Sequence, residues 1–205
     1  MESGRSAERD ALALSFDDGP SEWTPSILDL LAEHSARATF FVLGSSIDGR
    51  ERTLEQALEE GHELGLHGWT HRRLTELSAA EIENEMIETQ AAIERATGVV
   101  TQVWRAPYLE ADERVRRVLA GSGLVEAGCS IAPEDYRWPA ERTAVFVIKR
   151  LQPEAILDLH DGRPECSGSD PTRLETVRAL GLILSELDRL ELRGIPVSEL
   201  RARHA

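Results

Sequence analysis

The sequence contains little cysteine, few aromatic residues and no long apolar run. Its two cysteines, Cys129 and Cys166, are too few for a disulfide framework and do not form a close metal-binding pair, so we expect two reduced thiols. No apolar stretch approaches the ~20 residues of a membrane-spanning helix, and the opening segment MESGRSAERD lacks the pattern of a secretion signal. These absences predict a cytoplasmic protein without a membrane partner.

Basic residues are also outnumbered, because 23 lysines and arginines stand against 37 aspartates and glutamates and leave a formal net charge of -14. Such a charge argues against nucleic acid or an anionic surface as the main partner, since like charges repel the encounter. With 41% hydrophobic and 29% charged residues, the composition is that of an ordinary globular protein rather than a disordered one.

Short apolar segments alternate with helical patterns along the chain, without repeats or a Gly/Ser-rich linker. We therefore expect an N-terminal extension over residues 1–10 and a single domain over residues 11–205. Ser21 is expected to cap the first helix, and Ser78 with Glu81 to form a capping box for the longest one. The expected strands cover residues 11–16, 38–44, 62–67, 102–108, 123–130, 154–160 and 195–197. The expected helices cover residues 22–34, 51–60, 78–98, 110–120, 141–151 and 172–190.

This order predicts an α/β fold, a distorted (β/α) barrel of seven or eight units, in which functional residues lie at the carboxyl ends of the strands. Five polar residues fall at such ends, and this coincidence is the main argument for a site at that edge. These residues are Asp17, Asp18, His67, Arg105 and His160.

The motif LSFDDGP at residues 14–20 places two carboxylates, Asp17 and Asp18, at the end of the first apolar strand. Two unpaired, dehydrated carboxylates repel each other and cost several kcal/mol unless a cation or a shared proton compensates. The pair therefore indicates a site, although Asp also commonly caps turns that contain Gly and Pro.

The motif HGWTH places His67 and His71 four positions apart, so that both imidazoles can face one cation. It is not the zinc-protease motif HExxH, because position 68 is Gly and supplies no general base. One carboxylate would complete a two-His-one-carboxylate site, with Asp18 as the ligand and Asp17 beside it as a base. Two histidines at this spacing can also occur by chance.

Two further segments offer catalytic groups. The guanidinium of Arg105 can hold a carboxylate, and a turn at Pro107 can expose the backbone N–H of Tyr108. His160, which precedes Asp161, can act as a proton donor oriented by an acid. Arg105 alone is equally compatible with a structural role, and a lone histidine at a strand end more often has only a structural role.

Five segments carry a family resemblance when taken together: SFDDGP, HGWTH, RAPY, PEDYRW and ILDLHDG. Their order resembles the five motifs of the polysaccharide deacetylase family, also called carbohydrate esterase family 4 or the NodB homology domain. The resemblance covers nearly the whole chain. It implies a hydrolase that uses metal-activated water to remove an N-acetyl or related N-acyl group from an amino sugar or an amino-sugar metabolite.

The resemblance also implies a role for each motif residue. The metal ligands would be Asp18, His67 and His71, holding one divalent ion, usually zinc, with cobalt, nickel or manganese as other candidates. The catalytic residues would be Asp17 as general base, Arg105 as its orienting partner, Asp135 as the tether of Arg105, Tyr108 as backbone donor to the oxyanion and His160 as general acid. The substrate pocket would be lined by Trp69, Tyr136, Trp138 and Asp158.

The chain departs from the family pattern near two motifs. Leu66 and Gly68 flank the first metal-binding histidine where the family has Asn and Ser or Thr, which removes hydrogen bonds that fix the loop, and Arg72 replaces the usual Pro. Asp158 stands where an apolar residue lines the acyl-methyl pocket. A carboxylate is unfavourable beside a methyl group, so either the pocket admits a polar substituent or Asp158 pairs with a nearby cation.

Three other functions remain open from the sequence. One is metal-independent hydrolysis of a cyclic amide such as allantoin, and another is iron-dependent oxygenation, which also uses two His and one carboxylate. The third is an inactive relative that only binds carbohydrate. Within the deacetylase interpretation, the low aromatic content of 5% and the missing secretion signal favour a small intracellular glycan precursor over a wall polymer.

Overall fold

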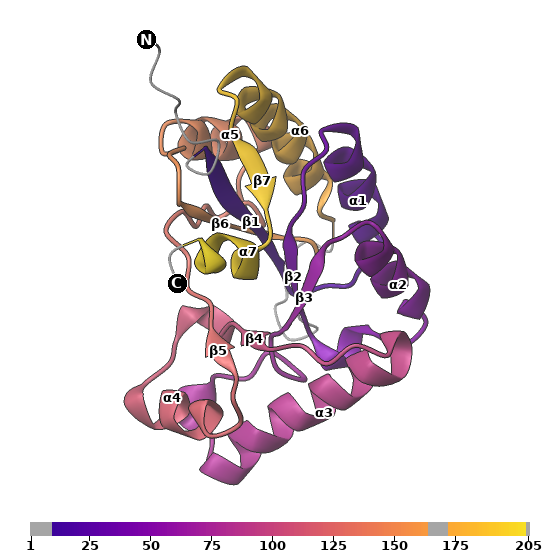
Figure 1. The fold of residues 1–205 in the computed structure, drawn as a ribbon, viewed down its shortest axis with the longest axis vertical. Coiled ribbons are helices and arrows are strands. Elements are labelled where there is room, and N and C mark those ends of the chain that lie inside the picture. The colour runs from indigo at the N-terminus through magenta and orange to yellow at the C-terminus, as the bar shows by residue number, and fades with distance from the viewer. Residues whose placement is uncertain (1–9, 164–171, 204–205) are drawn as a thin grey trace.

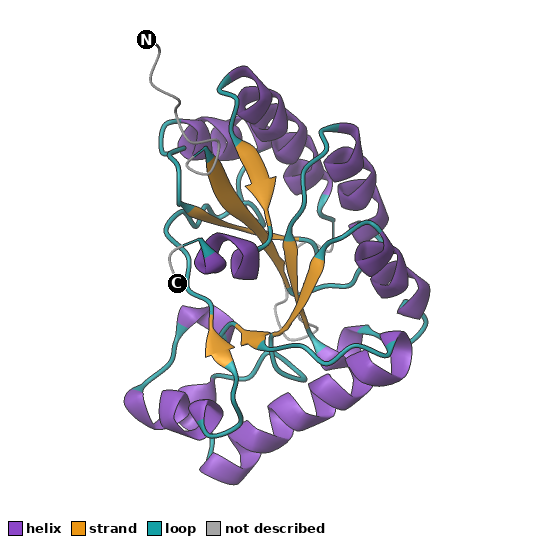
Figure 2. Cartoon of the chain, in the orientation of Figure 1, coloured by secondary structure: helices purple, strands orange, loops and turns teal. Residues whose placement is uncertain are grey.

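The computed structural model describes residues 10–163 and 172–203. Within them a parallel sheet curls into a half-barrel, and most of the helices lie along its outer side (Figures 1 and 2). Cys166 and nearly all of the expected N-terminal extension lie outside the described residues, while Cys129 is a free thiol.

The strands follow each other around the half-barrel in the order β5-β4-β3-β2-β1-β6, and β7 pairs with the first residues of β1. All pairings between these strands are parallel, as a chain of βα units requires. This arrangement confirms the predicted distorted barrel. The strands are β1 Ala11–Asp17, β2 Thr39–Val42, β3 Glu63–Leu66, β4 Val103–Trp104, β5 Val125–Glu126, β6 Ile156–His160 and β7 Arg193–Ile195.

The helices also lie close to the predicted segments, including the one with many β-branched residues near position 145, except for α7, which was not predicted. They are α1 Thr24–Glu33, α2 Glu51–Glu59, α3 Ala79–Thr97, α4 Glu113–Ala120, α5 Ala140–Ile148, α6 Leu174–Arg189 and α7 Val197–Ala202. Three short 3₁₀ turns separate them: η1 Gly44–Ser46, η2 Leu74–Glu76 and η3 Pro107–Leu109.

Local signals explain where the longest helix begins and ends. The predicted capping box forms at the start of α3, where Ser78 accepts a hydrogen bond from the Glu81 N–H and the Glu81 carboxylate accepts one from Ser78. At the other end Gly98 adopts a φ of 75°, a left-handed conformation that glycine adopts without steric cost.

The predicted cap of α1 is wrong. The helix starts at Thr24, with Trp23 in the N-cap position and no side-chain cap. Pro25 is compatible with this start, because proline is tolerated in the first turn of a helix. Ser21 instead accepts a hydrogen bond from the Trp23 N–H and donates one to the carbonyl oxygen of Asp161. Its hydroxyl thus joins the β1 and β6 loops.

Strand β1 is buried on both faces. Its successive side chains point to opposite faces of the sheet, so core residues lie on one face and site residues on the other. Leu12, Leu14 and Phe16 belong to the main apolar core, which also includes buried residues of α1 and α6. Ala11 and Ala13 face the inside of the half-barrel, where residues of α7 pack against them. On the same inner face Ser15 and Asp17 follow towards the carboxyl end of the strand, so the polar residues collect there.

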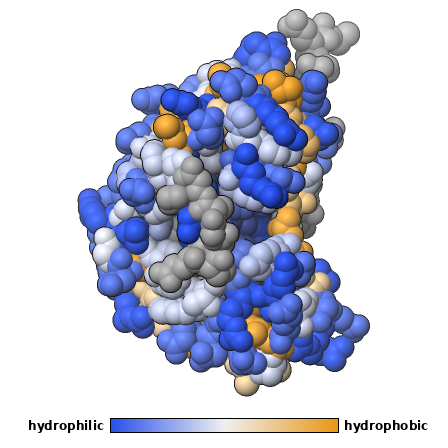
Figure 3. Space-filling model, turned by 180° about the vertical axis from the view of Figure 1, so that it is seen from behind, coloured by the Kyte–Doolittle hydropathy of each residue, from blue (hydrophilic) through white to orange (hydrophobic). Residues whose placement is uncertain are grey.

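The rear surface is mostly hydrophilic, with apolar side chains in small separate patches (Figure 3). Among the described helices, none combines the length and the apolar character needed to cross a bilayer.

We expect Gly65→Ala to destabilise the protein. A Cβ at Gly65 would lie 2.6 Å from the Phe41 ring, and overpacking of this kind typically costs about 1–3 kcal/mol. Gly181→Ala is the matched comparison, because Gly181 lies inside α6 with its nearest neighbour 4.0 Å away and Ala favours a helix by about 0.5–1 kcal/mol. Denaturant unfolding should give free energies that change in opposite directions; two changes of the same sign would contradict the packing described for β3.

Candidate active site

The carboxyl ends of β1, β3, β4 and β6 meet at one edge of the half-barrel and bring the predicted site residues together. Strand pairing fixes part of this geometry, because Ser15 is in register with Asp158 and Asp17 with His160 on the neighbouring strands β1 and β6. These four side chains therefore occupy one face of the sheet.

Asp18, His67 and His71 form a buried cluster whose ligand atoms all lie within 4.8 Å of one another. The Asp18 Oδ1 atom lies 3.5 Å from Nε2 of His67 and 3.3 Å from Nε2 of His71. This oxygen is buried and makes no hydrogen bond within the described residues, an unusual state for a carboxylate. Two imidazole nitrogens around an unsatisfied carboxylate oxygen fit a divalent cation.

Hydrogen bonding and burial prepare both imidazoles as ligands. His67 Nδ1 lies 2.9 Å from the Arg105 carbonyl oxygen and donates to it, which directs Nε2 towards the carboxylates. Burial, together with the charge of His67, lowers the pKa of His71 to about 4, so His71 is neutral at physiological pH. For Asp18 burial opposes ionisation, but the neighbouring His67, His160 and His71 hold its pKa below the usual value.

Two of these ligands have strained backbones. Asp18 has a φ of 74° and His71 a φ of 61°, in the left-handed region that non-glycine residues rarely adopt. Such conformations cost on the order of 1–3 kcal/mol and persist only where tertiary contacts impose them, as at functional sites.

Arg105 is fully buried, and its Nη1 atom donates to three partners. It lies 2.9 Å from Asp17 Oδ1, 2.8 Å from Asp158 Oδ1 and 2.8 Å from the Ser15 hydroxyl. The expectation that Asp135 tethers Arg105 is wrong. The carboxylate that binds Arg105 from β6 is Asp158, which is in register with Ser15 of β1. Of the two alternatives for Asp158, the ion pair with a nearby cation is the one the structure contains.

Asp135 instead binds His160. Its Oδ1 lies 2.8 Å from His160 Nδ1, and its Oδ2 accepts hydrogen bonds from the His160 backbone N–H and from the Thr176 hydroxyl. Burial alone would lower the pKa of His160, but the Asp135 carboxylate and its hydrogen bond outweigh burial and raise it to about 10. His160 is therefore a protonated imidazolium at neutral pH.

Asp158 also belongs to a second cluster, with Asp17 and His160, whose oxygen and nitrogen atoms lie within 4.8 Å of one another. Burial and the charge of Asp17 raise the pKa of Asp158 to about 7. The guanidinium of Arg105 already bridges the two carboxylates of this cluster. A second cation is therefore not needed there for charge balance.

The two tyrosines predicted for the site lie on opposite sides of it. The Tyr108 ring is centred 4.4 Å from the His71 ring and packs beneath the Arg73 guanidinium, and its backbone has a φ of 60°. The Tyr136 ring meets His160 edge-on at 4.9 Å. Both rings thus flank residues of the predicted machinery.

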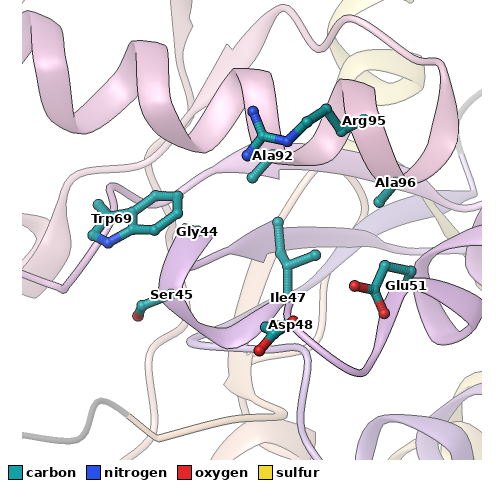
Figure 4. A pocket seen from close by; sticks show the side chains of 9 residues that line it. All are labelled: Gly44, Ser45, Ile47, Asp48, Glu51, Trp69, Ala92, Arg95 and Ala96. Atoms are coloured by element: carbon teal, nitrogen blue, oxygen red, sulfur yellow. The ribbon is translucent and has the colours of Figure 1, made fainter.

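The contacts found for the two predicted tryptophans are with residues outside the two clusters. The Trp138 ring packs on Phe146 of α5 and beneath Arg142. The Trp69 ring lies against Gly44 and lines a separate pocket of about 290 Å³ between η1 and α3 (Figure 4). That pocket contains none of the clustered acids and histidines; its lining residues are Gly44, Ser45, Ile47, Asp48, Glu51, Trp69, Ala92, Arg95 and Ala96. The sequence pattern showed that these rings exist but not which way they point.

Two acids that contact the motif loops were not singled out from the sequence. Glu85 accepts hydrogen bonds from the backbone N–H groups of Trp69 and Thr70, and the Asp161 carboxylate accepts one from Thr24. The signal for Glu85 was its place on the apolar stripe of α3, where a charged residue is out of pattern. In the sequence Asp161 is marked only by its position directly after His160.

Comparisons with known proteins agree with this geometry. The family model described as polysaccharide deacetylase matches residues 4–127. The chitooligosaccharide deacetylase of a Bradyrhizobium species is 35% identical over 198 residues, which cover 93% of this chain and 89% of the relative. The peptidoglycan-N-acetylglucosamine deacetylase PgdA of Listeria monocytogenes is 35% identical over 184 residues, covering 87% of this chain but only 38% of its own length.

The fold is similar as well. The structure of the peptidoglycan deacetylase PdaC from Bacillus subtilis superposes with a TM-score of 0.87 at 28% identity, over 97% of this chain and 93% of that chain. The chain therefore belongs to the polysaccharide deacetylase family, the NodB-like carbohydrate esterase family 4.

Proposed function

We propose that this protein is a hydrolase that depends on a divalent metal and removes an N-acetyl or related N-acyl group from an amino sugar. The observation that carries the proposal is the buried cluster of Asp18, His67 and His71 with a second carboxylate, Asp17, directly beside it. The names of its relatives, deacetylases of chitooligosaccharide and of peptidoglycan N-acetylglucosamine, support an amino-sugar substrate.

In this proposal Asp18, His67 and His71 hold the cation, for which zinc fits the two imidazoles and one carboxylate best. When bound, such an ion polarises a carbonyl group and lowers the pKa of a coordinated water molecule. The same cluster argues against the metal-independent alternative, because it has no other partner for the unsatisfied oxygen of Asp18 within the described residues.

Asp17 is proposed as the general base. Arg105 holds its Oδ1 atom at 2.9 Å, which fixes the orientation of the carboxylate. Its Oδ2 atom lies 3.5 Å from Nε2 of His67 and therefore faces the metal ligands. One oxygen is anchored and the other is available to accept a proton from a water molecule at the cluster.

His160 is proposed as the general acid. The pKa of about 10 that Asp135 maintains keeps a proton on the imidazole for donation to the departing amine, which an unactivated amide requires. The Tyr108 ring lies beside His71 and its backbone is left-handed, and in this proposal the Tyr108 N–H binds the developing oxyanion.

The first prediction separates catalysis from metal binding. Asp17→Asn should retain zinc but reduce acetate release roughly 10²–10⁴-fold, the usual contribution of a general base, whereas Asp18→Asn should lose the metal. Metal content and acetate release from N-acetylglucosamine oligomers and UDP-N-acetylglucosamine give the two readouts. Chelator-treated wild type, before and after zinc is restored, is the control. If no acyl amide in the panel is cleaved by zinc-loaded wild type, the inactive carbohydrate-binding alternative is favoured.

A second prediction concerns pH. Asp135 opposes the effect of burial on His160, so Asp135→Asn should lower the pKa of His160 from about 10. Because the acid must be protonated, the alkaline limb of kcat against pH should move to lower pH in this variant. The control is Glu134→Gln, which removes an adjacent carboxylate that does not bond to His160 in the structure. An alkaline limb that stays in place in Asp135→Asn would remove His160 from the acid role.

A third prediction tests the unusual Asp158. Asp158→Leu should lower the free energy of unfolding by about 3–5 kcal/mol, because it leaves the buried Arg105 with one carboxylate fewer. It should not alter the preference among N-formyl, N-acetyl and N-propionyl substrates, since the carboxylate bonds to Arg105. Asp158→Asn keeps the size of the side chain and serves as the comparison. A changed acyl preference in either variant would place Asp158 in contact with the substituent.

A further inference from the structure

The loop between the two histidine ligands lacks the side-chain hydrogen bonds that the family pattern supplies there. Leu66 and Gly68 flank His67, and neither carries a polar side-chain group. Gly68 has a φ of 83°, so the loop turns sharply at this point. Another part of the molecule must therefore hold the loop in place.

One side of the loop is held through its carbonyl groups. The Gly68 carbonyl accepts a hydrogen bond of 3.1 Å from the Gly44 N–H, and the Trp69 carbonyl accepts one of 3.0 Å from the Ser45 N–H. The Trp69 ring also lies against Gly44, at the end of the pocket between η1 and α3 (Figure 4). These contacts fix the loop to η1 through its carbonyl groups. The N–H groups of Trp69 and Thr70 need a different acceptor.

Glu85 of α3 supplies the acceptor. Its Oε2 atom lies 2.6 Å from the Trp69 N and 3.2 Å from the Thr70 N, and Oε1 lies 3.5 Å from the Thr70 hydroxyl. Glu85 is only 7% exposed, so these charge-assisted bonds form largely away from water. The two N–H groups that it holds belong to the two residues immediately before His71.

The charge of Glu85 is balanced from the same loop. Arg72, the residue that replaces the usual Pro, places Nη1 3.9 Å from the Glu85 carboxylate and also pairs with Glu81 one turn earlier in α3. The three departures from the family pattern around the histidine ligands, at positions 66, 68 and 72, thus accompany an anchor that comes from α3.

We infer that Glu85 is a positioning residue for the metal, acting through the backbone of Trp69 and Thr70 to hold His71 in its left-handed conformation facing Asp18. The inference rests on the proposed function in requiring that Asp18, His67 and His71 bind a cation. Without Glu85 the N–H groups of Trp69 and Thr70 would lose their acceptor, the backbone leading to His71 would rotate, and the imidazole would leave its place 3.3 Å from Asp18. The loss would appear in metal affinity before substrate is added.

The test is a titration of metal-free full-length protein with Co²⁺, followed by absorption, and with Zn²⁺, followed by calorimetry. Glu85→Ala should bind both ions about 10–100-fold more weakly, the usual effect of removing an outer partner of a metal site, and should change the Co²⁺ absorption bands. Glu85→Gln keeps one carbonyl oxygen acceptor, so its affinity should lie between those of Glu85→Ala and wild type. If Glu85→Ala does not fold, Glu85→Gln alone decides, with a loss of affinity expected.

Two controls separate positioning from general stability. Glu88→Ala removes an exposed carboxylate from the same helix and should bind both ions like wild type. Ile93→Ala removes a buried side chain of α3 away from the loop; it should lower the melting temperature of the metal-free protein but leave the Co²⁺ bands unchanged. The inference is overturned if Glu85→Ala and Glu85→Gln bind like wild type, or if Ile93→Ala weakens binding as much. If wild type itself binds neither ion, the proposed function fails instead.

Discussion

The arrangement of the site depends on one buried cation, the guanidinium of Arg105. A charge removed from water is stable only when charged and polar partners replace its hydration. Arg105 meets this requirement with carboxylates from β1 and β6, the Ser15 hydroxyl and the carbonyl groups of Ala127 and Gly128 after β5, while its guanidinium rests on the Phe41 ring. One side chain at the end of β4 therefore links elements across the half-barrel, and the carboxylate of Asp17 takes its orientation from that link.

Charge balance connects this link with the metal cluster. The acids Asp17, Asp18, Asp135 and Asp158 gather at the site, where Arg105 and the protonated His160 oppose them as cations. A divalent ion held by Asp18, His67 and His71 would add further positive charge beside these acids. The raised pKa of Asp158, caused by burial and by Asp17, is a measure of how closely the negative charges are gathered in the metal-free protein.

The sequence was informative where the structure depends on local chemistry and strand order. Residues that end parallel strands must meet at one edge of the sheet, so the approach of Asp18 to His67 could be expected from the motifs alone. Side-chain contacts between segments that are distant in the sequence could not be predicted in this way. Asp135 and Asp158 are both acids near the same motifs, and only the register of β6 against β1 decides that Asp158 reaches Arg105 while Asp135 reaches His160. The direction of the Trp69 ring likewise depends on the space left beside Gly44.

The short motifs DDG and HDG are better understood as two halves of one contact than as separate signatures. A Cβ on Gly162 would lie 2.0 Å from the Asp18 carbonyl oxygen, and a Cβ on Gly19 would lie 2.0 Å from the Asp161 carboxylate. Each loop can approach the other only because both glycines lack a side chain. The Asp17 carbonyl accepts hydrogen bonds from the N–H groups of Asp161 and Gly162, which joins the loops further. Gly19 thus leaves room for the Asp161 carboxylate and Gly162 for the Asp18 carbonyl group, so the left-handed backbone of Asp18 is set in close packing between the β1 and β6 loops.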